Sequence, residues 1–148
     1  MPLRGSEDSA GYDIFAIEDM TIPPSFNIYF PNDPTEMPQA NYDAPVMVRT
    51  GLKAYMPKNE VLLLFSRSSD GKRGLVIPNS VGVIDADYVD NPKNEGEIMF
   101  MFWNLSNKNI EIEKGDKLGQ GIFVKWEKVH VGDAHGETRN GGIGSTGR

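Results

Sequence analysis

Hydrophobic and polar residues alternate along much of the chain with a period of two. In the segment APVMVRTGLKAYMP (residues 44–57), alternation runs from Val46 to Met56 and predicts a half-buried pair of strands. The segments EVLLLFS (60–66) and GEIMFMFWNLS (96–106) are nearly continuous apolar runs, as expected of strands that are covered on both faces. We therefore expect a protein built from short strands.

The rest of the chain supports the same fold class. Residues 109–129, NIEIEKGDKLGQGIFVKWEKV, read as a strand, a Gly-Asp turn and a second strand with Ile122, Val124 and Trp126 on one face. The 16 Gly and 10 Pro are spread along the chain and leave little room for long helices. The segment at about 30–43 is rich in Pro and lacks periodicity, so we expect a surface insertion there. The pattern predicts one all-β domain over residues 1–148, a barrel or jelly roll.

Composition and charge narrow the possible partners. The net charge of -6 gives no broad electrostatic surface for nucleic acid or an acidic membrane. The chain has no Cys, which excludes disulfides, a thiol nucleophile and a thiolate metal site. No uncharged apolar run approaches the roughly 18 residues of a membrane span, and MPLRGSEDSAG lacks the apolar core of a signal peptide. We expect a protein of the cytoplasm, or of the host cytoplasm if a virus encodes it, that binds neither nucleic acid directly nor a membrane.

Five polar or Gly-rich clusters interrupt the predicted strands: DSAGYDIFA, SRSSDGKRG, NSVGVIDADY, GDKLGQ and RNGGIGSTGR. Asp13, in the first cluster, fits a turn residue equally well. Arg67, Ser68 and Ser69 follow an apolar strand and could cap it. The same three residues suit a phosphate, because Arg supplies paired charged donors and Ser supplies short neutral ones.

The third cluster carries the most specific chemistry. Asp85 follows Val83 and Ile84, which we expect to pack inward, so its carboxylate would lie at the edge of the core. Partial desolvation there raises the basicity of a carboxylate, which can then orient and deprotonate a water. Tyr88, three residues further on, offers an aromatic face to a sugar ring. The alternative is a hairpin turn whose Asp residues bond their own backbone.

Two other patterns carry less weight. His130 and His135 are five residues apart with no third ligand type at metal spacing, which argues against a transition-metal site. The ending GGIGSTGR approaches the phosphate loop G-x-x-x-x-G-K-[ST], but Arg148 stands where Lys should, and no helix follows. The segment at about 133–148 is then either a flexible end or an arm whose backbone amides close over an anion.

Taken in order, AGYD, RSS, NSVGVIDADY, GDKLGQ and RNGGIGSTG resemble the five motifs of the trimeric dUTPase family. The resemblance spans nearly the whole chain. It implies a jelly-roll-like β-barrel, a homotrimer, and hydrolysis of dUTP to dUMP and pyrophosphate with Mg²⁺. Such a reaction limits uracil incorporation into DNA and supplies dUMP for dTMP synthesis. In the family, each active site draws its motifs from three subunits.

The resemblance also implies a role for individual residues. Asp85 matches the residue that positions the attacking water, Tyr88 the aromatic floor under deoxyribose, and Asp13 the acidic residue that holds the water shell of the metal. The fifth motif matches a flexible arm that closes over the nucleotide. The other substrate-binding residues implied are Arg67, Ser68, Ser69, Asn79, Gly82, Val83, Ile84, Gln120, Arg139, Gly142, Ile143, Gly144, Ser145 and Thr146.

The sequence departs from the family pattern at three places. Ile143 stands where the family usually has a Phe that stacks on uracil, so this contact becomes aliphatic. The short turn that usually follows Tyr88 is replaced by the longer VDNPKNEGE. The family generally has a strand before the position of MPLRGS, and its absence would leave a sheet edge exposed or covered differently.

Two alternatives remain open at this stage. The related dCTP deaminases share the fold and an RSS motif, but their catalytic Glu belongs in the strand after the third motif, where this chain has Met101. The protein could instead be a dUTPase-like regulatory module that contacts a protein partner through the insertion at 30–43. The substitution Asp85→Asn separates this module from an enzyme, because a pure binding function should survive it.

Overall fold

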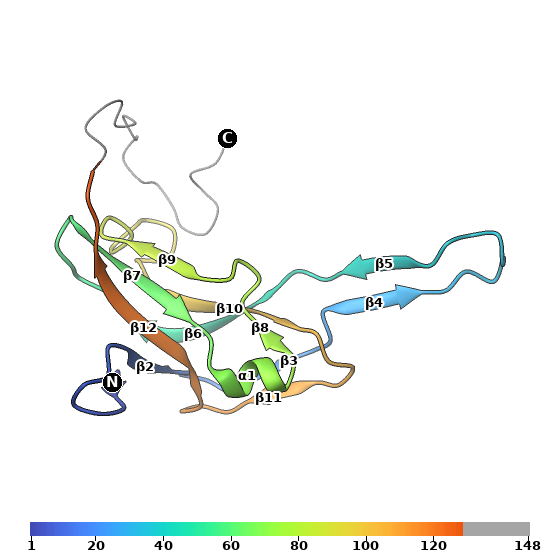
Figure 1. Cartoon of the computed structure of the whole chain (residues 1–148), viewed down its shortest axis with the longest axis horizontal. Helices are drawn as coiled ribbons and strands as arrows, with labels where there is room; N and C mark the ends of the chain where they lie inside the picture. Colours follow the sequence, from blue (N-terminus) through green and yellow to red (C-terminus); the bar gives the residue numbers. More distant parts are fainter. Residues whose placement is uncertain (129–148) are drawn as a thin grey trace.

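The computed structural model describes residues 1–128, and within this part the chain consists of antiparallel strands and one short helix (Figure 1). The strands are β1 (Leu3–Arg4), β2 (Tyr12–Phe15), β3 (Met20–Ile22), β4 (Phe26–Tyr29), β5 (Gln39–Tyr42), β6 (Val46–Leu52), β7 (Glu60–Phe65), β8 (Leu75–Val76), β9 (Gly82–Asp85), β10 (Ile98–Asn104), β11 (Ile110–Ile112) and β12 (Lys117–Lys125); helix α1 spans Ser68–Lys72. No helix in this part is long and apolar enough to cross a membrane.

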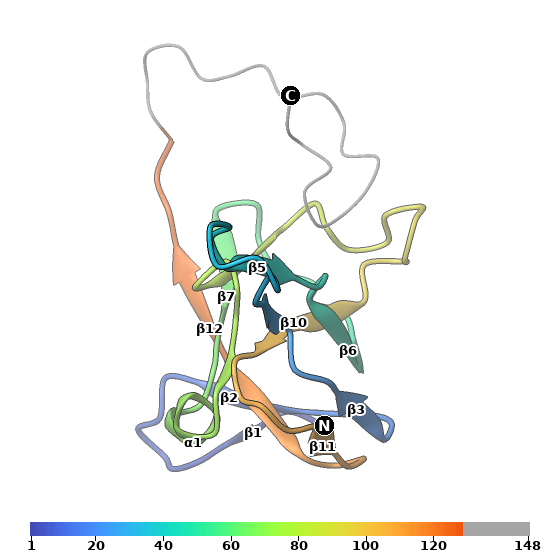
Figure 2. The same cartoon turned by 90° about the vertical axis from the view of Figure 1, so that its right-hand side faces the viewer.

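The strands of residues 1–128 form four sheets. The largest has the order β1-β2-β12-β7-β9, and a second has the order β6-β10-β8. Two pairs, β11-β3 and β4-β5, complete the arrangement. Figure 2 shows the same strands from the side. The N-terminal β1 pairs with β2, so this short strand forms the edge of the five-stranded sheet.

The hydrophobic core contains residues from both main sheets. Leu62 and Leu64 of β7 point inward and are almost fully buried, as are Phe100 and Phe102 of β10. The β12 backbone passes so close to Phe100 that a Cβ at Gly119 would overlap the phenyl ring. Alternate residues of the apolar runs therefore build the core, as the period of two predicts.

The opposite face of the five-stranded sheet, which we call the outer face, is also apolar. Val61 and Leu63 of β7 lie in register with Val124 and Ile122 of β12, and Val83 of β9 lies beside Leu63. In the single chain Val83 is 55% exposed and Val124 is 39% exposed. The prediction that β7 is covered on both faces is thus met on one face only within the chain.

The predicted strand pair at 44–57 is one strand, β6. Its ladder to β10 contains a bulge: the register jumps from the Arg49–Met99 pair to the Leu52–Ile98 pair, so that Thr50 and Gly51 bulge out before the strand ends at Leu52. Gly51 has φ of +64°, in the left-handed region that favours glycine. Residues 53–56 continue the alternation without pairing in a ladder.

The segment expected to be an irregular insertion contains a strand. β5 pairs with β4 in a hairpin that extends away from the two main sheets (Figure 1). Its base is held by aromatic contacts, with the ring centroid of Tyr42 5.1 Å from that of Phe26 and 6.0 Å from that of Trp103. Pairing with β4 supplies the regular structure that the three prolines of the segment argued against.

The predicted Gly-Asp turn is present, but the strands on either side do not pair with each other. The Glu113 backbone N–H donates to Asp116 Oδ2 at 3.0 Å, and Gly115 has φ of +92°. β11 pairs with β3, whereas β12 joins the five-stranded sheet. The turn thus connects two sheets rather than closing a hairpin.

Candidate active site

Asp13 and Gln120, from opposite ends of the described sequence, meet in the five-stranded sheet. They are register partners of β2 and β12, and Gln120 Nε2 donates to Asp13 Oδ1 at 3.0 Å. Lys117 Nζ lies 2.5 Å from Asp13 Oδ2. The bond from Lys117 is the main cause that lowers the pKa of the Asp13 carboxyl below its usual value, and the bond from Gln120 adds to it. Burial acts in the opposite direction but does not outweigh these bonds. Asp13 is therefore an anion at neutral pH, with both oxygens engaged.

Lys117 is a site residue that the sequence reasoning did not single out. Residues 117 and 120 would point to opposite faces of a regular strand, because they are three positions apart. The β12 register against β2 shifts between Lys117 and Gly119, and this bulge brings both side chains to Asp13. The signal available in the sequence was the position of Lys117 inside GDKLGQ.

Arg67 joins this cluster from the end of β7. Its Nη1 donates to the Lys117 carbonyl at 2.9 Å, so the guanidinium lies next to the residue that pairs with Asp13. Ser68 and Ser69 follow in α1 and are exposed. Asp13, Arg67 and Gln120 thus come together, which the separate motifs alone could not establish.

Asp70 is a second residue that the sequence did not predict at this site, and its carboxylate bonds the Arg67 backbone. Its side chain is almost fully buried, and Oδ2 accepts the Arg67 backbone N–H at 3.3 Å. Arg73 Nη2 lies 3.3 Å from Oδ1. Burial raises the pKa of the Asp70 carboxyl, and the bonds from the two arginines oppose this shift.

Asp85 and Tyr88 lie at the other end of the sheet. Asp85 is the last residue of β9 and lies opposite Val61, while the Tyr88 backbone N–H donates to the Asp85 carbonyl at 3.0 Å. The expectation that Val83 and Ile84 both pack inward is wrong for Val83, because successive residues of a strand face opposite sides. Ile84 packs against the core, and Val83 lies on the outer face.

The turn before β9 contains Asn79, which is exposed, and Ser80, which has φ of +64°. Gly82 lies opposite Leu64, where an added Cβ would come within 3.1 Å of the Leu64 Cβ. A short side chain at this position keeps β9 close to β7. β8 before this turn pairs with β10, and β9 after it pairs with β7, so the turn connects two sheets, and its exposed backbone groups can contact a ligand.

Tyr88 is only 3% exposed, and its hydroxyl is held by the loop that follows it. Asn94 Nδ2 donates to the hydroxyl at 2.7 Å, and the hydroxyl donates to the Glu97 carbonyl at 3.1 Å. A sugar would therefore meet only a small part of this side chain. The expected open aromatic face is thus largely covered within the chain, and two hydrogen bonds hold the hydroxyl.

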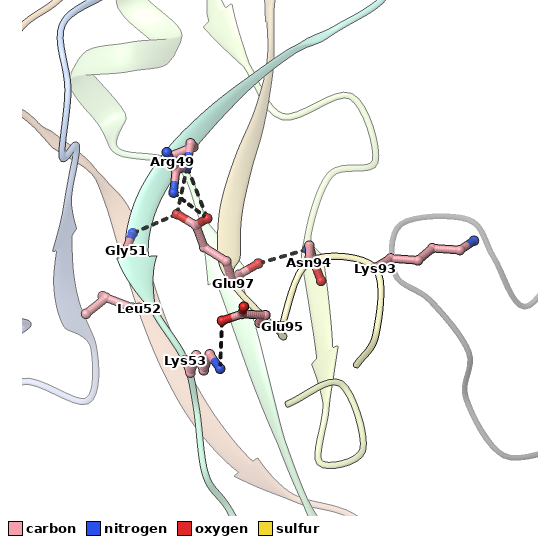
Figure 3. Close-up of a pocket in the computed structure, with 8 residues that line it drawn as sticks. All are labelled: Arg49, Gly51, Leu52, Lys53, Lys93, Asn94, Glu95 and Glu97. Carbon is pink, nitrogen blue, oxygen red and sulfur yellow. Dashed lines mark hydrogen bonds and ion pairs between the residues drawn. The ribbon is translucent and has the colours of Figure 1, made fainter. Parts of the chain in front are cut away.

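Figure 3 shows the pocket of about 450 Å³ behind this loop. Two of its cations are paired: Arg49 Nη2 lies 3.0 Å from Glu97, and Lys53 Nζ lies 3.6 Å from Glu95. The charges inside the pocket are thus largely balanced by the protein. The lining residues are Arg49, Gly51, Leu52, Lys53, Lys93, Asn94, Glu95 and Glu97.

The candidate residues that the structure describes fall into two separate clusters within one chain. Along β7, Asp85 is level with Val61, and Gln120 is level with Phe65. Four residues of strand separate these levels by about 13 Å. Asp13, Arg67 and Gln120 therefore lie at one end of the outer face and Asp85 at the other. The predictions for Arg139, Gly142, Ile143, Gly144, Ser145 and Thr146, and the histidines at 130 and 135, fall outside the described residues.

Comparison with known proteins identifies the family. The dUTPase family model matches residues 26–147. The chain belongs to the dUTPase family. A deoxyuridine 5'-triphosphate nucleotidohydrolase of Lactococcus lactis is 42% identical, with 99% of this chain and 87% of the relative covered. Its counterpart in Hydrogenobaculum is 30% identical, with 99% and 90% covered.

Solved dUTPases have the same fold. The crystal structure of the Streptococcus mutans dUTPase has a TM-score of 0.73 and 38% identity, with 87% of this chain and 88% of that chain covered. The dUTPase from phage phi11 of S. aureus, described with a structural Mg(II) ion, has a TM-score of 0.65 and 22% identity over 91% and 89% of the chains. The expected all-β, jelly-roll-like dUTPase fold is confirmed.

Proposed function

We propose that this dUTPase hydrolyses dUTP to dUMP and pyrophosphate, acting as a dUTP diphosphatase. Family membership over nearly the whole chain supports the reaction. The assignment of this reaction to particular residues is supported by the proximity of Asp13, Arg67 and Gln120, which come from three distant segments of the sequence. An anion, a guanidinium and an amide at one sheet end suit a metal-bound triphosphate.

The active form is proposed to be a homotrimer. The outer face is an apolar stripe flanked by the two polar clusters, and an apolar face of this kind requires a cover. A second copy lying on this face would bury the stripe. It could also bring Asp85 of one subunit to the Asp13 cluster of another, which no single chain does. The shared active sites that the family resemblance implies agree with this arrangement.

In the proposed mechanism, Asp85 orients a water and takes up its proton. The water oxygen attacks the α-phosphorus, and the bond to the oxygen that bridges the α- and β-phosphates breaks, so that pyrophosphate leaves. Arg67, Ser68 and Gln120 hold the phosphate oxygens. Tyr88 forms the wall beside the sugar, and segment 79–84, the turn before β9 and the start of β9, reads the base.

Magnesium is proposed to bind through water rather than directly to the protein. In residues 1–128 no group of three or more His, Cys, Asp or Glu lies close enough to hold an ion. Both Asp13 oxygens already accept a bond, from Gln120 and Lys117, but each keeps a lone pair for a metal-bound water. Mg²⁺ retains waters and commonly binds substrate phosphates, so this site fits it, and it would supply charge neutralisation there.

The function is tested by measuring pyrophosphate release from dUTP with and without Mg²⁺, beside dTTP, dCTP and UTP. We expect rapid release from dUTP alone, dependent on Mg²⁺. The substitution Asp85→Asn should lower the rate by at least about a hundredfold while affinity for α,β-imido-dUTP stays within about threefold. The matched control is Asp33→Asn in the projecting hairpin. Undiminished hydrolysis by Asp85→Asn would exclude its role as the base, and binding without hydrolysis by the unaltered protein would favour a regulatory module.

A further inference from the structure

The loop after Tyr88, residues 89–97, is built around two asparagines. Asn91 Nδ2 donates to the Tyr88 carbonyl at 2.8 Å and to Asn94 Oδ1 at 2.6 Å. Asn94 Oδ1 also accepts the Gly96 backbone N–H at 3.2 Å. With its Oδ1 used inside the loop, Asn94 directs its Nδ2 to the Tyr88 hydroxyl at 2.7 Å. The loop is therefore a closed network with Tyr88 as one member.

The backbone of the loop has little freedom to take another course. Asp90, Glu95 and Gly96 have φ of +56°, +57° and +77°, all in the left-handed region. A Cβ at Gly96 would lie 2.6 Å from the Val89 Cα, so only glycine fits. Two non-glycine residues in such a conformation persist only where the surrounding contacts fix them.

Strand β6 and the residues after it supply those contacts. Lys53 Nζ lies 2.8 Å from Asp90 Oδ1, and the Tyr55 hydroxyl donates to Asp90 Oδ2 at 3.0 Å. Figure 3 shows the other attachment, where Arg49 and the Gly51 backbone N–H both bond the Glu97 carboxylate. The loop thus connects Tyr88 to the second main sheet.

We propose that Asn94 is a positioning residue that fixes the Tyr88 ring, and that the loop thereby sets how strongly the enzyme rejects a ribonucleotide. This inference rests on the proposed function, in which Tyr88 is the wall beside the sugar. The Tyr88 ring excludes a 2′-hydroxyl only if the ring is held in place. A fixed ring makes the steric overlap with the hydroxyl unfavourable, whereas a loosely packed ring would shift and relieve it. Both bonds to the hydroxyl, from Asn94 and to the Glu97 carbonyl, oppose tilting of the ring.

The test compares the affinities of α,β-imido-dUTP and α,β-imido-UTP, measured by calorimetry with Mg²⁺. We expect Asn94→Ala to reduce the ratio of the two affinities by about three- to tenfold, mainly by strengthening UTP-analogue binding, the effect of one hydrogen bond. Tyr88→Phe removes both bonds to the hydroxyl and should reduce the ratio at least as much, and the double variant should go no further than Tyr88→Phe, since the bond that Asn94→Ala breaks is already absent there. Asn94→Asp keeps the Oδ1 acceptor and can accept from the hydroxyl, so it should restore part of the ratio.

The matched control is Lys93→Ala, an exposed neighbour in the same loop that should leave the ratio unchanged. A ratio unaltered in folded Asn94→Ala, with only a lower melting temperature, would overturn the proposal and leave the loop a purely structural role. If Asn94→Ala does not fold, the ratio of affinities in Tyr88→Phe tests the proposal instead, because this variant removes only the hydroxyl that Asn94 bonds. Failure of the unaltered protein to bind either analogue would instead refute the proposed function itself.

Discussion

Removal of Lys117 should expose the dependence of the buried Asp13 carboxylate on its partner. Asp13 is 5% exposed and accepts only two bonds in the described structure, from Lys117 and Gln120. In Lys117→Met the carboxylate keeps the amide donor and loses the cation. A charge-assisted hydrogen bond contributes about 1.5–3 kcal/mol. The Lys117 side chain is 34% exposed, so water screens part of this contribution. We therefore expect Lys117→Met to lower the free energy of unfolding by about 2 kcal/mol at pH 7.

The loss should depend on pH with a definite sign. Pairing with Lys117 lowers the pKa of Asp13 below 3.8, so the stabilisation is present above that pH and is lost as pH falls through the lower, folded-state value. In the variant the main cause of that lowering is gone. The deficit should therefore be full from pH 6 to 7 and should narrow only below the usual pKa of 3.8, as the Asp13 carboxyl protonates in both proteins.

Urea unfolding at fixed protein concentration measures this deficit, because any association would make stability depend on concentration. Adding Asp13→Asn to Lys117→Met should recover at least half of the loss, since no uncompensated charge stays buried. The control is Lys114→Met, an exposed Lys of the preceding turn, expected within about 0.5 kcal/mol of the unaltered protein. If the free energy of unfolding of Lys117→Met at pH 7 also lay within about 0.5 kcal/mol of that of the unaltered protein, the proposed role of Lys117 would be refuted.

Two further substitutions test the loop and the outer face. Gly96→Ala should lower the free energy of unfolding, measured by thermal denaturation, by about 2 kcal/mol or more, because the backbone is left-handed there and the added Cβ would lie 2.6 Å from the Val89 Cα. The control is Gly71→Ala, whose Cβ would meet nothing within 4 Å and which should be neutral or slightly stabilising. Leu63→Glu places a charge in the middle of the outer face, and light scattering should show a monomer that hydrolyses dUTP poorly. Met37→Glu, on the exposed hairpin, should leave both mass and activity unchanged, and an active Leu63→Glu monomer would contradict a site shared between subunits.

The strands that the sequence predicts best are those in which local pattern and burial agree. The runs at 60–65 and 98–104 have enough apolar residues to specify extended structure without knowledge of their partners. The motifs likewise identify Asp13, Arg67 and Gln120 one by one. Their proximity is a property of sheet order, in which β12 lies between β2 and β7, and no local pattern states that order.

The features that the sequence did not predict depend on irregular or distant pairing. Lys117 reaches Asp13 only because β12 contains a bulge, and the bulge follows from how β12 meets β2. The strand at 39–42 exists because β4 pairs with it, although its neighbourhood of prolines argues against a strand. The longer loop after Tyr88 was visible as extra length, but the bond from Asn94 to the hydroxyl depends on the folded course of the loop.

The outer face connects assembly and catalysis in one argument. Its middle is apolar, its ends carry Asp85 and the Asp13 cluster, and about 13 Å of strand keeps these ends apart within a chain. In the proposed mechanism, the water that Asp85 holds must lie within hydrogen-bond reach of that carboxylate and also close to a phosphorus bound near Arg67. Within the described residues of one chain, Asp85 and the Asp13 cluster lie too far apart for both conditions, and the proposed packing of copies on the apolar stripe would bring them together. In the proposed trimer, burial of that stripe would also complete the active site, so dilution into monomers should abolish hydrolysis while leaving each chain folded.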